Sequence, residues 1–431
     1  MSAISQGPGF HPAMSTVRTP ALGFILITLT LDILGIGLIV PILPGLVKEF
    51  SGGDTAAASH ATGWLNALYA LMQFIFAPLF GCLSDKVGRR PVILLSQFGL
   101  ALDYVLLALA PSLSWFVVGR VVAGITGANF AAASAYIADV SPPEKRAANF
   151  GLIGAAFGVG FIIGPLIGGT LGQFGLRLPF YAAGALTLLN WMYGWFILPE
   201  SLKPENRRPI DWRRANPFGA FAELARRPRV FGLAVCAFLS FLAHQVYPSV
   251  WVLYTGHRYG WSPLWNGVSL ALVGVCAAVM QGVLTGRVIG RIGVWRTAYL
   301  GLAVSALAYA AYGLASQGWM IYGIIVAASI GGLATPAVQG LISNSVGDDE
   351  QGTVQGAVTS LESAAGVAGP LIATALFSYF IAPERSAQIP GAPFFSSGII
   401  ALLALVAAWQ ARRGMRKREA FSALPATAGN G

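Results

Sequence analysis

Charged residues are scarce in this sequence. Asp, Glu, Lys and Arg make up only 10% of its 431 residues, while 55% are hydrophobic. A soluble domain is typically about 25% charged. Apolar segments of about 20 residues recur from residue 22 to residue 408, and each is long enough to cross a hydrocarbon core of about 30 Å. The scarcity of charge therefore excludes an ordinary soluble domain and predicts a chain that crosses a membrane many times.

Cysteine is also scarce, and neither a metal nor a cofactor is expected. Cys82, Cys236 and Cys276 are odd in number and lie in or beside apolar segments at no metal-ligand spacing, which predicts no disulfide framework. No nucleophile–base constellation is present, so an enzyme is not expected. The first 20 residues contain one arginine and no apolar core, which argues against a cleavable signal peptide.

Glycine, by contrast, is abundant, and its 53 copies suit membrane helices that approach one another closely. We expect an all-α membrane protein with twelve transmembrane helices in two pseudo-symmetric six-helix halves. The expected spans are roughly 21–47, 62–82, 91–110, 113–138, 149–172, 178–198, 229–254, 263–286, 295–315, 318–344, 352–381 and 393–411.

Lysine and arginine set the expected orientation. Twelve spans put both termini on one side, and 22 of the 27 Lys and Arg residues fall on that side. Only Lys48, Arg177, Arg258 and Arg385 fall on the other side, and Arg120 lies within a span. Both termini are therefore predicted to be cytoplasmic. The basic loops are interpreted as topology signals and anionic-lipid contacts, and no nucleic acid is expected as a partner.

The chain is expected to divide at a polar linker rich in Pro and Arg. The parts are a cytoplasmic N-terminal tail (1–20), a six-helix half (21–198), the cytoplasmic linker (199–228), a second six-helix half (229–411) and a cytoplasmic C-terminal tail (412–431). A short interfacial helix is expected in the linker at about 217–226. Gly81 and Gly286, Gly88 and Gly293, and Pro165 and Pro370 are all 205 positions apart, which indicates an internal duplication.

Several motifs carry a family resemblance. GCLSDKVGRRP at 81–91 resembles the loop signature of the major facilitator superfamily, and GFIIGPLIGG at 160–169 resembles the helix-five motif of its drug/proton antiporters. LDILGIGLIVPILPGL at 31–46 and GRVVAGITGAN at 119–129 are similar to the tetracycline-efflux family. The resemblance covers nearly the whole chain, and weakens in the linker and in the last 25 residues. The helix-bend motif and its echo in the second half comprise Gly160, Gly164, Pro165, Gly168, Gly169, Gly369 and Pro370.

The loop signature predicts a conformational latch. Asp85 and Arg89 flank a tight turn at Gly88. The resemblance implies that the loop aspartate lies against helix eleven and favours the outward-facing state, and that the arginine pairs with an acid at the cytoplasmic end of helix four. Asp139 is placed for that role. A partly buried pair of this kind holds one conformer by about 1–2 kcal/mol. The alternative is that Lys86, Arg89 and Arg90 only mark topology.

Four charged residues inside spans are candidates for proton coupling or substrate binding: Asp32, Asp103, Arg120 and Glu362. Each costs about 2.5–3.5 kcal/mol to insert, which favours a functional role. Asp103 and Arg120 are equally far from the turn between helices three and four, so we predict that they form a buried ion pair. For Asp32 and Glu362, an interhelical hydrogen bond is the structural alternative. Polar residues that either line a cavity or tie helices together are Gln73, Asn129, His244, Gln245, Gln281 and Gln339.

The predicted function is proton-coupled efflux of amphiphilic drugs such as tetracycline-like compounds, by alternating access. The alternative is proton-coupled or facilitated transport of a small metabolite. The expected partners are the drug, alone or as a metal chelate, protons and the bilayer, with a monomer as the working unit in a bacterial inner membrane. Tetracycline exporters resemble one another in a helix-eight histidine and a helix-nine aspartate, where this chain has Ala277 and Ser305. Glu362 is expected to supply the carboxylate that the second half otherwise lacks.

Overall fold

The computed structural model describes residues 19–127, 129–209, 228–346 and 351–422, apart from the side chains of a few of them. Within these ranges every regular element is helical. The expected interfacial helix at about 217–226 lies outside the described residues.

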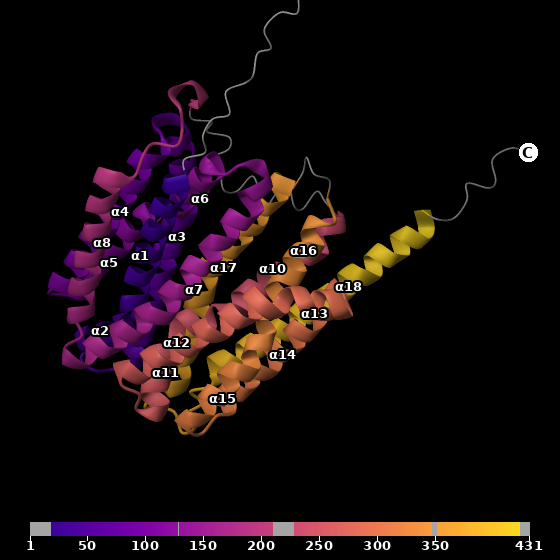
Figure 1. The fold of residues 1–431 in the computed structure, drawn as a ribbon. Helices are drawn as coiled ribbons and strands as arrows, with labels where there is room; N and C mark the ends of the chain where they lie inside the picture. The colour runs from indigo at the N-terminus through magenta and orange to yellow at the C-terminus, as the bar shows by residue number, and fades with distance from the viewer. Residues whose placement is uncertain (1–18, 128, 210–227, 347–350, 423–431) are drawn as a thin grey trace, which may run out of the picture.

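The first six-helix half is built from residues 19–197 (Figure 1). Its helices are α1 (Thr19–Ile39), α2 (Leu43–Phe50), α3 (Thr55–Val87), α4 (Arg89–Leu109), α5 (Leu113–Thr126), α6 (Asn129–Val140), α7 (Pro143–Phe174) and α8 (Leu178–Ile197). A short 3₁₀ turn, η1 (Pro204–Asn206), follows in the linker.

The second half is built from residues 228–422. Its helices are α10 (Pro228–His244), α11 (Val246–Tyr259), α12 (Pro263–Val279), the π-helix η2 (Met280–Leu284), α13 (Thr285–Ile292), α14 (Val294–Leu314), α15 (Gly318–Ala328), the 3₁₀ segment η3 (Ser329–Leu333), α16 (Ala334–Ser343), α17 (Gln351–Ile381) and α18 (Ala392–Ser422).

These helices form twelve spans, as predicted. Eleven are apolar and long enough to cross a membrane by hydropathy alone. The twelfth is α8, which packs between α1 and α4 in the bundle. Its 20 residues include Asn190, two tryptophans and two tyrosines, and these lower its mean hydropathy.

Several spans are interrupted helices. The first breaks between Ile39 and Leu43, where Pro41 and Pro44 disrupt the helix. The seventh breaks at Gln245, and the eighth contains the π-helix at Met280–Leu284. Such π segments occur frequently at functional sites. Gln245 and Gln281 therefore both lie where the backbone departs from the α-helix.

Many helices extend beyond their predicted limits. Helix α3 covers Thr55–Val87 where the span was expected at about 62–82, and α18 continues to Ser422 beyond an expected end at about 411. The hydropathy pattern detects only the part of a helix that faces hydrocarbon. Polar residues such as His60 and Arg416 continue the helix past that layer, because backbone hydrogen bonding does not end at the membrane surface.

The internal duplication is visible in the backbone. Helices α4 and α14 are both 21 residues long, and their limits differ by the same 205 positions as the sequence repeat. Gly88 and Gly293, which precede them, have φ angles of +112° and +81° and similar ψ angles of 158° and 157°. Glycine adopts such positive φ values at little cost. The repeat predicted from the sequence is therefore confirmed.

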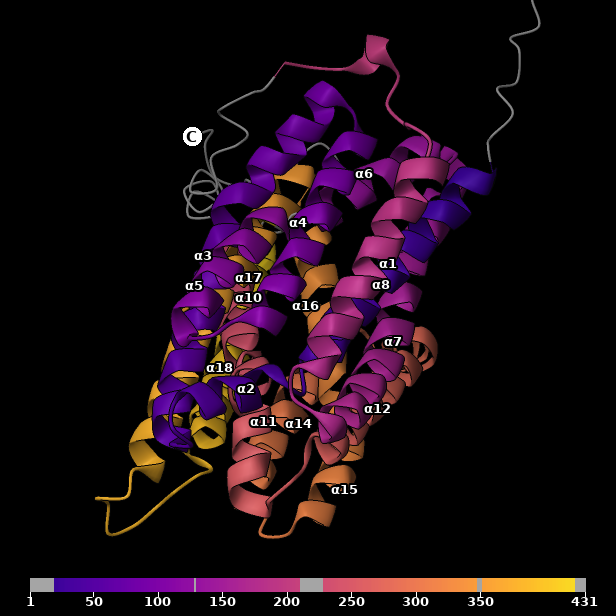
Figure 2. The same ribbon diagram turned by 90° about the vertical axis from the view of Figure 1, so that its left-hand side faces the viewer.

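The two halves meet mainly at one end of the molecule. We call the end where α1 begins and α18 ends the terminal end, and the opposite end the far end (Figures 1 and 2). At the far end α3 packs on α17 and α7 packs on α12. The Ser59 hydroxyl donates a 3.1 Å hydrogen bond to the Thr374 carbonyl, and Gly169 lies against Pro263 and Gly267.

This packing fades toward the terminal end. A Cβ on Gly158 would still lie 3.9 Å from that of Ala278, but one on Gly151 or Gly286 would meet no described atom within 4 Å. The halves are therefore joined along the far half of their interface.

Candidate transport site and conformational latch

A buried ion pair lies inside the N-terminal half. The Arg120 guanidinium donates a 2.9 Å hydrogen bond from Nη2 to Oδ2 of Asp103. The Asp103 residue has no exposed surface, and only 7% of Arg120 is exposed. Gly119 makes the pair possible, because a Cβ there would collide with the Asp103 carboxylate. The ion pair predicted from the symmetric placement of the two residues is confirmed.

The neighbours of this pair come from helix α3. The Arg120 guanidinium carbon lies 5.5 Å from the ring centroid of Tyr69, a cation–π distance. Gln73 donates hydrogen bonds of 3.1 Å to the Tyr69 hydroxyl and 3.2 Å to the Gly127 carbonyl. Gly127 is where α5 ends in the fourth span. Gln73 therefore ties α3 to this break, which is the helix-linking role that the sequence left open.

Asp32 is bound to helix α8 within the same half. Only 2% of it is exposed, and its Oδ1 accepts a 2.8 Å hydrogen bond from Nδ2 of Asn190. The same nitrogen donates a 2.9 Å bond to the Thr28 carbonyl. This is the interhelical contact considered as the structural alternative for Asp32. It also fixes the orientation of the carboxylate deep in the half.

Glu362 is in a different environment. It lies on α17 in the C-terminal half and its residue is exposed. No hydrogen bond or ion pair joins it to any described residue, so the interhelical hydrogen bond considered as its structural alternative is not found there. Its carboxylate is therefore available to a mobile partner.

The other polar candidates are spread over the C-terminal half. His244 is exposed at the end of α10 and lies edge-on to Tyr247, with ring centroids 5.2 Å apart. Gln245 packs against Gly366 and Gly369 of α17, whereas Gln281 is exposed and Gln339 is half-buried. The side chain of Asn129, in the N-terminal half, lies outside the described residues.

Aromatic side chains gather beside the break in the seventh span. The Tyr247 ring lies 5.4 Å from Tyr309, 5.7 Å from Tyr312 and 5.9 Å from Trp251, measured between centroids. The Trp251 indole donates a 3.0 Å hydrogen bond to the Ser269 hydroxyl. The composition showed many aromatic residues, but only the fold reveals that they form one cluster.

The glycine-rich motif of the fifth span is a double contact surface. Gly160 and Gly164 lie against Ile33, Leu34 and Gly37 of α1. Gly168 touches the α1 backbone at Leu38. The same helix reaches the other half, since Gly169 and Pro165 lie against α12. Substituting these glycines would separate helices in and between the halves.

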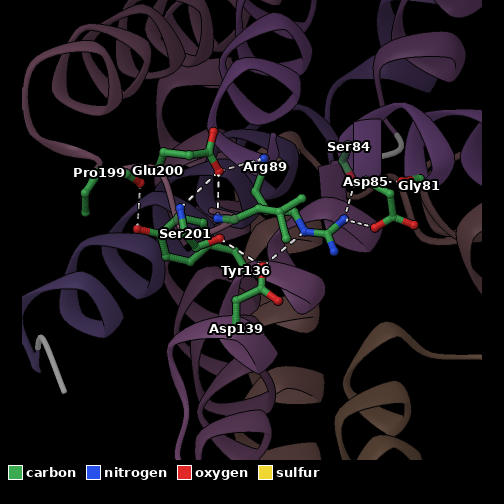
Figure 3. A network of polar contacts seen from close by, with 10 residues as sticks. Gly81, Ser84, Asp85, Arg89, Tyr136, Asp139, Pro199, Glu200 and Ser201 are labelled. Atoms are coloured by element: carbon green, nitrogen blue, oxygen red, sulfur yellow. Dashed lines mark hydrogen bonds and ion pairs between the residues drawn. The ribbon is translucent and has the colours of Figure 1, made fainter. Parts of the chain in front are cut away.

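The residues predicted to form a latch lie together at the terminal end, around Arg89 (Figure 3). Its guanidinium forms ion pairs of 2.5 Å with Asp85 and 3.2 Å with Asp139, and donates a 2.6 Å hydrogen bond to the Ser84 hydroxyl. The pairing of Arg89 with Asp139 at the end of the fourth span is confirmed. No contact of Asp85 with α17 is found among the described residues.

Glu200 belongs to the same group of contacts, although the sequence analysis did not identify it. Its Oε1 accepts hydrogen bonds from the backbone N–H groups of Arg89 (2.9 Å), Ser201 (3.0 Å) and Leu202 (3.1 Å). The carboxylate thus caps the first turn of α4, where the helix dipole favours negative charge. Gly88 is constrained twice, because a Cβ there would also collide with the Glu200 carboxylate.

The start of the linker is bound to the latch as well. The Ser201 hydroxyl donates a 3.0 Å hydrogen bond to Asp139, and the Tyr136 hydroxyl donates one of 2.9 Å to the Pro199 carbonyl. The Arg208 N–H donates a 3.0 Å bond to the Asp85 carbonyl. A sequence pattern gave no sign of these contacts, because they join residues more than 60 positions apart.

Two six-helix repeats with a buried ion pair in the membrane define a multi-pass membrane transporter. A family model for the Major Facilitator Superfamily matches residues 25–370. Tetracycline resistance protein class C of Escherichia coli is 43% identical over 358 residues, which cover 83% of this chain and 90% of that protein. The class H protein of Pasteurella multocida is 36% identical over 362 residues, covering 83% and 89%.

Solved structures share the fold at low identity. The human organic anion transporter MFSD10 (TETRAN) has a TM-score of 0.68 at 24% identity, covering 92% of this chain and 100% of that one. A bacterial homologue of human Spinster, inward-facing and unoccupied, has a TM-score of 0.75 at 19% identity, covering 94% and 99%. The chain belongs to the Major Facilitator Superfamily, within its group of tetracycline resistance proteins.

Proposed function

We propose that this protein exports amphiphilic drugs of the tetracycline type from the cytoplasm in exchange for protons. The observation that carries the proposal is the 43% identity to a tetracycline resistance protein over 90% of its length. A membrane transporter confers resistance by lowering the drug concentration inside the cell, so similarity to a tetracycline resistance protein favours export over the uptake of a metabolite. The fold alone does not decide the direction of transport.

The proposed orientation rests on the charges of the loops. The terminal end carries most of the Lys and Arg residues, which favours a cytoplasmic location for it and for both termini in a bacterial inner membrane. The far end, where the halves are joined, then faces away from the cytoplasm. The conformer in the structure is accordingly open toward the cytoplasm and can take up drug from that side. A monomer contains all of the residues in this proposal.

In this proposal, some charged residues bind the proton and another binds the drug. Asp32 and the Asp103–Arg120 pair bind and release the proton inside the N-terminal half, where burial against α5 and α8 isolates them from bulk water. Glu362 binds a positive group of the drug, or of a drug–metal chelate, because its carboxylate is exposed and has no described partner. The proposed activity is transport without covalent chemistry, and no catalytic residue is assigned.

Drug susceptibility tests the substrate class. The gene is expressed in a host deleted for its own pumps, and resistance to a panel that includes tetracyclines is compared with that of an Asp103→Asn variant. We expect the wild type to raise resistance to tetracyclines and the variant to lose it at equal expression. Acidified vesicles should release protons when the drug is added. Accumulation of a sugar or an amino acid instead would overturn the export proposal.

Cross-linking tests the proposed conformer. In a background with Cys82, Cys236 and Cys276 replaced by serine, the pair Gly158→Cys and Ala278→Cys should oxidise readily, because the two Cβ atoms lie 3.9 Å apart, close to the usual disulfide spacing of about 3.8 Å. The matched pair Gly151→Cys and Gly286→Cys should not oxidise without drug. Equal cross-linking of both pairs would contradict a conformer closed at the far end only.

A further inference from the structure

Tyr104 stands between the two acidic sites of the N-terminal half. It follows Asp103 on α4. Its Cβ would lie 3.5 Å from a Cβ on Gly184 of α8, and its ring extends to Gly35 of α1. Only 1% of the residue is exposed. Tyr104 is therefore a buried hydroxyl-bearing residue that is adjacent in sequence to Asp103 and reaches the helix that carries Asp32.

Two hydroxyl groups lie beside Gly35, which is about one helical turn from Asp32. A Cβ on Gly35 would lie 3.7 Å from the Tyr104 hydroxyl oxygen and 3.3 Å from Oγ1 of Thr187, so both oxygens border the same point on α1. Thr187 is three residues before Asn190, on the helix that holds the Asp32 carboxylate. The glycine is needed here, because a larger side chain would occupy the space between the hydroxyl groups.

This region is rich in polar atoms that other described residues leave unpaired. The Tyr104 hydroxyl, Thr187 Oγ1, Asn190 Oδ1 and Asp103 Oδ1 are all buried and have no hydrogen-bond partner in the described part of the chain. Buried polar groups are otherwise almost always paired, in part with ordered water. The four atoms lie on α4 and α8, which pack against each other, and α8 also packs against α1, the helix of Asp32.

We propose that Tyr104 and Thr187 form a proton relay between Asp103 and Asp32, which deepens the proposed function and depends on it. When protonated Asp103 passes its proton to the Tyr104 oxygen, that hydroxyl gives its own proton onward, through the Thr187 hydroxyl or a bridging water, to the Asp32 carboxylate. Each hydroxyl ends with one proton, Asp103 ends as a carboxylate beside Arg120, and Asp32 ends as a neutral acid. Asn190 is a positioning residue that aims the Asp32 carboxylate at this path.

The test separates drug movement from proton movement in proteoliposomes. Tyr104→Phe removes only the hydroxyl, and Tyr181→Phe, on the exposed face of α8, is the matched control. Exchange of labelled for unlabelled tetracycline at equal pH on both sides needs no proton transfer, whereas uphill transport driven by a pH gradient does. We expect Tyr104→Phe to keep exchange and to lose uphill transport and drug-induced proton release by roughly a hundredfold or more, the lower range of positioned proton transfer.

The outcomes are distinguishable from failure of the proposed function. If the wild type and Tyr181→Phe show no exchange and no uphill transport of tetracycline, the proposed function fails. If they work and Tyr104→Phe matches them in both assays, or loses exchange as much as uphill transport, the relay is wrong. If Tyr104→Phe does not fold, Thr187→Val, which also removes only a hydroxyl, decides by the same criteria. A larger slowing of uphill transport in D₂O for the wild type than for the variant would support the relay.

Discussion

The Asp103–Arg120 pair offers a direct test of how charge is held in this protein. We consider Asp103→Asn, Arg120→Gln and the double variant. Each single change leaves one charge buried without its partner, because Asp103 has no exposed surface and Arg120 is 7% exposed. Stranding a charge in this way costs about 3–5 kcal/mol. The double variant removes both charges, so it should be more stable than either single variant.

The structure also predicts which single variant is the weaker one. In Asp103→Asn the stranded guanidinium retains the Tyr69 ring at 5.5 Å, a contact that contributes about 0.5–2 kcal/mol. In Arg120→Gln the buried Asp103 carboxyl group can take up a proton and become neutral, whereas a guanidinium cannot lose its charge. Asp103→Asn should therefore be the less stable of the two, although the Tyr69 contact reduces the difference by about 0.5–2 kcal/mol.

Equilibrium unfolding in mixed detergent, followed by tryptophan fluorescence, measures these differences. The exposed pair Glu384→Gln and Arg385→Gln, in the loop after α17, is the control and should show no measurable coupling. Additive losses in the Asp103/Arg120 cycle, or a double variant less stable than both singles, would refute the reasoning. Transport by the double variant is expected to be lost even where its stability recovers, because the proton site is gone.

Three further outcomes are expected. Gly88→Ala should lower expression and transport more than Gly293→Ala. Both glycines have a positive φ, but only Gly88 also lies against the Glu200 carboxylate. Equal effects of the two changes in a paired expression and uptake assay would count against the capping role of Glu200. Glu362→Gln, normally expressed, should lose drug transport against a gradient, and a variant that retained full export and proton exchange would make Glu362 structural. If a monovalent cationic drug leaves for one proton, clamping the membrane potential with valinomycin at constant ΔpH should not change the rate, since a moved charge would be worth about 2.3 kcal/mol per 100 mV.

Much of the architecture can be predicted from the sequence because the membrane restricts the backbone structures that a chain can adopt. A span must satisfy its own backbone hydrogen bonds, so apolar length predicts helices, and the 205-residue repeat predicts two equivalent halves. The Asp103–Arg120 pair was also predictable, since two antiparallel helices joined by a short turn place residues at equal distances from it side by side.

Contacts between distant helices were not predictable in this way. Asn190 holds Asp32 across 158 positions, and Glu200 caps α4 across 111 positions. No periodicity links such residues, because their proximity is set by the packing of α8 against α1 and α4. The break of the seventh span at Gln245, by contrast, has a local signal that was missed, since Pro248 lacks the N–H that would bond to the His244 carbonyl and its ring crowds that carbonyl.

The internal repeat allows the charged residues of the N-terminal half to be compared with their counterparts in the C-terminal half. At the constant offset of 205, Asp103 corresponds to Ala308 and Arg120 to Ile325, and both of these are buried in the C-terminal half. The apolar residues are what a stable membrane bundle requires, since each buried charge has a cost that a hydrophobic residue avoids. Tyr104, by contrast, corresponds to Tyr309, which stacks in the aromatic cluster beside Tyr247. The described ion pair thus lies in the N-terminal half, and apolar packing takes its place in the C-terminal half. This division agrees with the proposal that the N-terminal half binds the proton. The C-terminal half would then bind the drug through its aromatic side chains and the exposed Glu362.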